Sequence, residues 1–408
     1  MRFPSCWGRI ALTALLCTIF APMSLNARPI TLPAALDSAT QDSPTIIQAR
    51  GELAAAAGRA RQAGVRPNPQ LGLTVENFAG TGEFRRFRSA ELTASVSQQF
   101  EFGGKRSSRR AVAAAELVGA ELRVAVASAN VERDVRTNFA ELSAARDRVA
   151  LARDSEQRAR ELFRTVALLV KYGREPPLRA LRAQAALAEA EAATQASIAA
   201  YARSQRNLAG LLGLGEVDLE PLGAVELVTA TPPSADPALS LDVRLASAER
   251  DAAYARVKLE EATAVPDVTA ELGVKRFQGS NDTAVIAGIS FPIPIANRNG
   301  GAIAAARANL NSAEARLSQA RLDAIRAVRG AEADLFAADA RVQALQTSGL
   351  GQAREALRLA RIGYAAGKFS FLELLDAQSA LNQAEAALID AQLARAQAAA
   401  ALIRAQAQ

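Results

Sequence analysis

Most of the chain consists of segments in which apolar residues recur with the period of an α-helix. The longest spans residues 104–171, where Gly119 is the only internal glycine and proline is absent. Its apolar positions lie seven, seven, four and seven residues apart, as in a coiled-coil seam, at Leu117, Val124, Val131, Val135 and Leu142. At about 1.5 Å per residue, these roughly 68 residues predict a rod of about 100 Å. Such a helix is too long for the core of a single globular domain.

The same pattern predicts further long helices over residues 176–212, 301–362 and 371–406. Residues 210–237 are instead rich in Gly, Pro, Val and Leu, which favours irregular structure or short strands. The chain is therefore predicted to be mainly α-helical, with a break near its middle.

Four short stretches alternate apolar and polar residues with the period of a β-strand. They form two pairs, residues 70–76 with 91–102 and residues 268–275 with 285–295, each joined by a polar loop. Strands of about 9 to 11 residues with one apolar face are typical of transmembrane β-barrels. The alternative is two amphipathic hairpins on a soluble domain. The apolar positions are Leu71, Leu73 and Val75; Leu92, Ala94, Val96, Phe100 and Phe102; Val268, Ala270, Leu272 and Val274; and Val285, Ala287, Ile289, Phe291, Ile293 and Ile295.

The two halves of the chain are related to each other. The segment that begins at Leu181 matches the one that begins at Leu375, an offset of 194, and residues 100–105 match residues 293–298 at an offset of 193. Glu52 and Glu249 correspond at an offset of 197. Three nearly equal offsets indicate an internal duplication. We expect a first repeat over residues 28–215, a linker over 216–237 and a second repeat over 238–408.

The N-terminus has the pattern of a secretory signal peptide over residues 1–27. Arg2 and Arg9 form a basic start, residues 10–20 are apolar, and Ala27 closes the cleavage site. A transmembrane anchor is an alternative, since the apolar stretch is about long enough to span a bilayer. A lipid anchor on Cys17 is another, although Leu16 before it is larger than the small residue usual there.

Composition removes several kinds of chemistry from the exported chain. There is no histidine, and both cysteines, both methionines and the only tryptophan lie within the first 23 residues. We therefore expect no disulfide, no thiolate or imidazole metal site, no cofactor and no catalytic residue. An enzyme is the weakest hypothesis. The net charge of +6 comes from interspersed charges of both signs, which favours solvated helix faces over nucleic-acid binding.

The strands place a constraint on oligomeric state. Four strands cannot close a barrel, and an open strand edge is not tolerated in lipid. Three chains would supply twelve strands, enough for a water-filled pore. We therefore expect a homotrimer in outer-membrane lipid. Alanine, at 95 of 408 residues, suits closely packed helices.

The layout of signal peptide, repeated strand pair and long hairpin resembles the TolC family of outer-membrane efflux channels. Residues 66–71 and 291–298 are similar to family segments beside the strands, and residues 98–106 (QQFEFGGKR) are similar to the CzcC-like heavy-metal branch. The resemblance implies a trimeric twelve-stranded barrel continued by a periplasmic helical tunnel. It also implies two partners, a periplasmic adaptor protein and an inner-membrane RND pump.

The resemblance further implies a gate at the periplasmic end. Two acids three residues apart in the second hairpin tip map onto Glu373 and Asp376, and a locking tyrosine maps onto Tyr364. Spacing of three places both carboxylates on one helix face, where a trimer would form acidic rings that favour cations. The alternative is that they stabilise the helix N-terminus.

The first tip departs from the family pattern. Arg179 replaces the expected acid, with Arg182 one turn later, and Phe369 replaces a locking arginine. A hypothesis is that Arg179 and Arg182 pair with Glu373 and Asp376 of another protomer.

Adaptor docking is expected on the turns themselves, around Gly173 and Leu178 and around Gly367 and Ser370. The alternative is that the glycines only serve the turn. The run at residues 103–107 lacks the first glycine of a phosphate loop. We instead expect Lys105 and Arg106, with the nearby Arg109 and Arg110, to lie where the barrel meets the tunnel.

These observations together predict a passive outer-membrane channel for metal cations such as cobalt, zinc and cadmium. Export of drugs or other organic solutes by the same channel stays open. A secreted trimeric coiled-coil rod or adhesin is the alternative of a different class.

Overall fold

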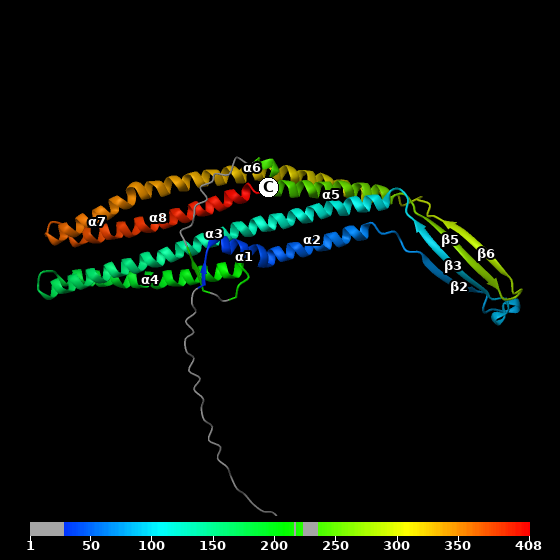
Figure 1. Ribbon diagram of the computed structural model, residues 1–408, viewed down its shortest axis with the longest axis horizontal. Helices are drawn as coiled ribbons and strands as arrows, with labels where there is room; N and C mark the ends of the chain where they lie inside the picture. Colours follow the sequence, from blue (N-terminus) through cyan, green and yellow to red (C-terminus); the bar gives the residue numbers. More distant parts are fainter. Residues whose placement is uncertain (1–27, 216–217, 223–235) are drawn as a thin grey trace, which may run out of the picture.

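The protein is a long rod of helices with a small β-sheet at one end (Figure 1). The computed structural model describes residues 28–215, 218–222 and 236–408. The predicted signal peptide and most of the predicted linker therefore lie outside the described residues. A strand pair followed by a long helical hairpin occurs twice in the element order.

The first hairpin consists of α3 (Lys105–Lys171) and α4 (Pro177–Leu211), and both agree with the sequence prediction. The 67 residues of α3 form one uninterrupted helix. It follows Gly103 and Gly104, both in the left-handed region at φ 71° and 77°. Of the predicted seam, Val131, Val135 and Leu142 are buried.

The second hairpin is interrupted where the sequence predicted one continuous helix. It comprises α6 (Gly300–Ala344), a π-helical turn (Leu345–Gly349), α7 (Leu350–Ala365) and α8 (Phe371–Ala405). Within the turn, the hydroxyls of Thr347 and Ser348 donate hydrogen bonds to the carbonyls four residues earlier, at 2.8 and 3.0 Å. Such bonds compete with regular helix geometry.

The π-helical turn shifts the buried seam by one residue. The buried positions of α6 follow coiled-coil spacing at Ala306, Ala313, Leu317, Ala324, Val328, Ala331, Ala338 and Val342. The seam residues that pack in α7 are Leu350, Ala353, Leu357, Ala360 and Tyr364. If the spacing of α6 continued without interruption, each seam position in α7 would fall one residue earlier than it does. A π-helical turn accommodates one extra residue, so it keeps the seam facing α8.

The helix α8 is the one helix in the described part of the chain that is long and apolar enough to cross a membrane. It lies instead beside α3, α6 and α7 (Figure 1). Its apolar composition is explained by alanine packing between helices.

The sheet contains four antiparallel strands in the order β2-β3-β5-β6. They are β2 (Gln70–Glu76), β3 (Glu91–Phe100), β5 (Val268–Phe277) and β6 (Thr283–Ser290). The two hairpins of the sheet therefore join through β3 and β5, and β2 and β6 are left as edges. The predicted fourth strand extended to residue 295 and is wrong beyond Ser290, because Pro292 and Pro294 have no N–H for strand pairing.

One face of the sheet is apolar and exposed. The register places Leu73, Ala94, Val274 and Val285 side by side on it. Leu71 and Ile289, on the same face, are 74% and 75% exposed. The opposite face carries polar side chains, including Gln70, Thr74, Ser95, Ser97, Glu271 and Lys275. This is the alternation expected of strands between lipid and water.

A compact core lies near the middle of the rod, which the sequence analysis did not predict. There β1 (Arg28–Ile30) pairs in parallel with β4 (Leu219–Pro221), beside α1 (Leu32–Asp42), α3 and α4. Bulky side chains fill it, among them Ile46, Phe139, Leu142, Leu208 and Leu212. Two shorter helices, α2 (Pro44–Ala63) and α5 (Leu241–Thr263), run along α3 toward the sheet (Figure 1).

Candidate functional site

Two places bring polar side chains from distant segments of the chain together and form the candidate sites. One is the pair of hairpin tips, at the end of the rod farthest from the sheet, and the other is the junction of the sheet with the helices (Figure 1). The tips hold the residues predicted to form the gate, so they are described first.

The tip between α3 and α4 closes on a left-handed glycine. Gly173 has φ 71°, and its N–H donates to the carbonyl of Val170 at 3.0 Å. The next N–H, from Arg174, donates to the carbonyl of Leu169 at 2.9 Å. This is the Schellman pattern of helix termination. A Cβ on Gly173 would meet nothing within 4 Å, so the backbone conformation alone favours glycine here.

The tip between α7 and α8 closes in the same way at Gly367, which also has φ 71°. The N–H of Lys368 donates to the carbonyl of Gly363 at 2.8 Å. Phe369 then packs directly on Gly363, where an added Cβ would lie 2.2 Å from the Phe369 ring. The phenylalanine found in place of the family's arginine therefore makes an apolar contact within its own tip.

The start of α8 is a capping box. The N–H of Glu373 donates to Oγ of Ser370 at 3.2 Å, and the N–H of Ser370 donates to Oε2 of Glu373 at 2.5 Å. The hydrogen bond from the Ser370 backbone lowers the pKa of Glu373 below its ordinary value. Helix stabilisation, the alternative considered for this acid, is therefore present in the structure.

The two tips are joined by a hydrogen bond between side chains. The hydroxyl of Tyr364 donates to Oε1 of Glu175 at 3.1 Å, and Arg179 forms an ion pair with Oε2 of the same carboxylate. Burial raises the pKa of Tyr364, and the neighbouring carboxylate of Glu175 raises it further. The Tyr364 ring also lies 6.0 Å from that of Phe371, in a cluster with Val166 and Ala183.

The first tip carries an acid that the sequence analysis did not consider. It is Glu175, four residues before Arg179, and that helical spacing was the available signal. Within the described chain, Arg179 contacts Glu175 rather than the acids of the second tip. Arg182 and Asp376 are exposed and form no ion pair with another described residue of the chain.

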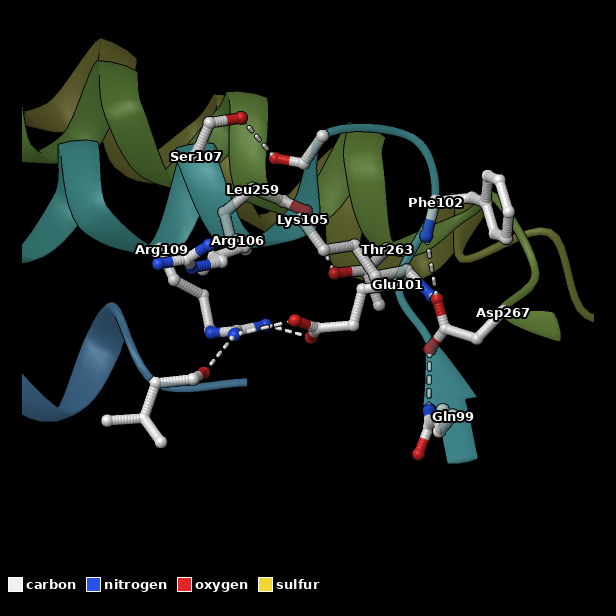
Figure 2. Close-up of polar contacts among 12 residues, drawn as sticks. Gln99, Glu101, Phe102, Lys105, Arg106, Ser107, Arg109, Leu259, Thr263 and Asp267 are labelled. Carbon is white, nitrogen blue, oxygen red and sulfur yellow. Dashed lines mark hydrogen bonds and ion pairs between the residues drawn. The ribbon is translucent and has the colours of Figure 1, made fainter. Parts of the chain in front are cut away.

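The second place is the junction of the sheet with α3 (Figure 2). Asp267, just before β5, accepts hydrogen bonds from Lys105 Nζ at 2.7 Å, Gln99 Nε2 at 2.8 Å and the Phe102 N–H at 3.3 Å. Burial alone would raise the pKa of Asp267, but these three bonds lower it. The ion pair with Lys105 connects the start of the first hairpin to the strand of the second repeat.

Two arginines extend the same junction toward α2 (Figure 2). Arg109 binds Glu101 with both terminal nitrogens, one at 2.9 Å, and these hydrogen bonds lower the pKa of Glu101. Arg109 also donates to the carbonyl of Val65 at 3.3 Å, and Arg106 donates to that of Gly64 at 2.6 Å. The basic run thus lies where the sheet meets the helices, as predicted.

Comparison with known proteins identifies the family. The sequence profile described as outer membrane efflux protein matches residues 35–214 and 237–408. The chain belongs to this family. As a member, it is an efflux protein of the outer membrane.

Two relatives within the outer membrane efflux protein family are named for metal resistance. The cobalt-zinc-cadmium resistance protein CzcC of Cupriavidus metallidurans is 30% identical over 363 residues, 88% of this chain and 85% of that protein. The nickel-cobalt-cadmium resistance protein NccC of Alcaligenes xylosoxydans xylosoxydans is 32% identical over 304 residues, 73% of this chain and 68% of that protein.

Solved structures of outer-membrane channels share the fold. The outer membrane protein VceC of Vibrio cholerae superposes with a TM-score of 0.78 at 23% identity, covering 92% of this chain and 95% of that one. The transmembrane channel CusC superposes with a TM-score of 0.81 at 18% identity, covering 92% of each chain.

Proposed function

We propose that this efflux protein is the outer-membrane channel of a tripartite system that exports divalent metal cations such as cobalt, zinc and cadmium. The observation that carries the proposal is the similarity to the cobalt-zinc-cadmium resistance protein over 88% of the chain. A periplasmic adaptor and an inner-membrane RND pump would supply selection and energy, and the channel would conduct passively.

The channel is a trimer in this proposal. The sheet has two open edges, β2 and β6, and a continuous exposed apolar face. Unpaired strand edges are not tolerated in a bilayer, so joining β6 of one protomer to β2 of the next satisfies both edges. Three chains then form a barrel of twelve strands, wide enough for water and ions.

The gate of the channel lies at the hairpin tips. Tyr364 and Glu175 hold the second hairpin against the first, and the ion pair with Arg179 holds the Glu175 carboxylate in place. Glu373 and Asp376 project from the first turns of α8, where three protomers would present acidic rings to entering cations. Arg182 is exposed and unpaired within the described chain, so it is available to an acid of the neighbouring protomer.

The adaptor would dock on the two turns. At the first turn, Leu178 beside Gly173 is 58% exposed. At the second turn, between α7 and α8, Gly367 and Ser370 are both exposed. A Cβ on either glycine would meet nothing within 4 Å, which leaves room for a partner to approach the backbone.

Deletion of the gene tests the substrate. The proposal expects reduced tolerance of cobalt, zinc and cadmium, with tolerance restored by the native gene and unchanged for a panel of organic antibiotics. Sensitivity to the antibiotics alone would assign the channel to organic solutes. Unchanged tolerance of both, together with no conductance of the purified protein in bilayers, would contradict a channel role.

A further inference from the structure

The strand register assigns each side chain of the sheet to one of its two faces. Because the apolar face must meet lipid, the polar face lines the lumen of the proposed barrel. Cross-strand partners on the polar face form rows across the sheet. One row consists of Gln70, Ser97, Glu271 and Gly288, and the next toward the loops consists of Gly72, Ser95, Gly273 and Ile286.

Glu271 is the only ionisable residue in either row. Its side chain is exposed and forms no ion pair with another described residue of the chain. Its partner on β6 is Gly288, where an added Cβ would lie 3.9 Å from the Glu271 carboxylate. Small neighbours therefore leave this carboxylate in the open lumen.

The lumen carries a second group of charges near the loops. Lys275 Nζ lies 2.7 Å from Glu76 Oε2 and 2.5 Å from Glu91 Oε2. Two carboxylates share one ammonium group, so this group keeps one net negative charge. With Glu271, each chain contributes two net negative charges to the strand rows that face the lumen.

We infer that Glu271, supported by the excess acid of the Glu76–Lys275–Glu91 group, makes the barrel itself selective for cations. This inference rests on the proposed trimeric channel, in which threefold symmetry places three copies of Glu271 at one depth. The carboxylates act through their field and do not coordinate the ion. Charge of one sign in a water-filled passage with low-dielectric walls raises the local concentration of counter-ions.

The salt dependence of this effect follows from screening. The Debye length is about 30 Å at 0.01 M salt, about 10 Å at 0.1 M and about 3 Å at 1 M. A field from the wall therefore reaches across a wide lumen only in dilute salt. Cation selectivity is strong at low ionic strength and disappears at high ionic strength.

The test measures reversal potentials of purified trimers in planar bilayers under a KCl gradient in dilute salt. The native channel is expected to prefer K⁺ over Cl⁻, and Glu271→Gln to lower the permeability ratio at least about twofold. Ser97→Lys, which places an ammonium group beside Glu271 and changes the charge of the same row by the same amount, is expected to lower it to a similar extent. Arg276→Gln is the matched control, because Arg276 lies on β5 but on the lipid-facing side, beside Leu92.

The outcomes separate this inference from the proposed function. A native channel that conducts without cation preference, or a Glu271→Gln channel with the native ratio, would overturn the inference and leave the channel intact. Native trimers that do not conduct would overturn both. A higher ratio in Arg276→Gln together with the native ratio in Glu271→Gln would show that the sheet faces are assigned wrongly.

Discussion

The hydroxyl of Tyr364 lies 3.1 Å from Oε1 of Glu175, a residue 189 positions earlier in the chain. This hydrogen bond joins the tips of the two helical hairpins, one from each repeat. It is the side-chain hydrogen bond at the tips that must break if the second hairpin is to swing away from the first.

Replacing Tyr364 by phenylalanine tests this connection. The change removes one hydrogen bond, a cost of about 1 kcal/mol, while the ring contact with Phe371 remains. We expect larger single-channel conductance, because the closed arrangement of the tips is less populated. Tyr254→Phe is the control, since Tyr254 is an exposed tyrosine on α5, away from the tips. Native conductance in Tyr364→Phe would mean that this bond does not hold the gate.

The same bond predicts an alkaline transition. Burial and Glu175 raise the pKa of Tyr364 above its ordinary value of 10.0. A raised pKa stabilises the folded tip fully below that ordinary value, and the contribution is lost as the pH rises through the raised pKa. Conductance of the native channel should therefore be constant from about pH 7 to 9 and increase above about pH 10. Tyr364→Phe should lack this increase.

Conservative substitutions of the two acids of α8 can separate the effect of their charge from helix capping. Glutamine at position 373 can still accept the capping hydrogen bond, so Glu373→Gln removes charge and keeps the cap. We expect Glu373→Gln and Asp376→Asn each to raise, by roughly several fold, the zinc concentration that half-blocks the channel from the periplasmic side. Ser370→Ala should instead lower the free energy of unfolding by about 1 kcal/mol and leave the half-blocking zinc concentration at its native value. Block that is unaffected by both acid changes would leave helix capping as the role of Glu373.

The junction should be sensitive to a single methyl group. Gly103 has φ 71°, and a Cβ there would lie 2.6 Å from Cβ of Val265. We expect Gly103→Ala to destabilise the protein by about 2 kcal/mol or more, measured as a lower dissociation temperature of detergent-solubilised trimers. Gly300→Ala is the control, because an added Cβ meets nothing within 4 Å at the start of α6. Equal dissociation temperatures would contradict the contact.

The π-helical turn predicts an unusual tolerance of deletion. Removing Ser348 would let α6 and α7 join as one regular helix with the seam in phase, so we expect stability within about 1 kcal/mol of native. Removing the exposed residue Ala333 from the middle of α6 would rotate the following seam by about 100° and should prevent stable folding. Thermal unfolding of the two variants, followed by circular dichroism, measures the difference. Similar stabilities would mean that the seam does not depend on the turn.

Local patterns account for what could be predicted from the sequence. The helix α3 and the strands β2, β3 and β5 were predicted from periodicity, because the apolar or polar character of each residue indicates which face of the element it lies on. The strand β6 was extended too far because alternation continues through Phe291 although Pro292 and Pro294 cannot pair. The π-helical turn was missed because a one-residue shift appears only when the seams of α6 and α7 are compared.

The site was harder to predict, because its contacts join segments far apart in the sequence. Tyr364 was identified through a family resemblance, but its partner Glu175 was overlooked beside Arg179. The basic run at Lys105 was placed correctly, since it directly follows a strand. Its carboxylate partner Asp267 lies in the other repeat, and only the folded chain brings the two together.

The open edges of the sheet have a consequence for biogenesis. A single chain carries two unpaired strand edges, on β2 and β6, and neither edge can enter the hydrocarbon layer alone. In the proposed trimer, membrane insertion must therefore wait until three subunits have met. Assembly and insertion become one event, whose rate depends steeply on the concentration of newly secreted subunits in the periplasm.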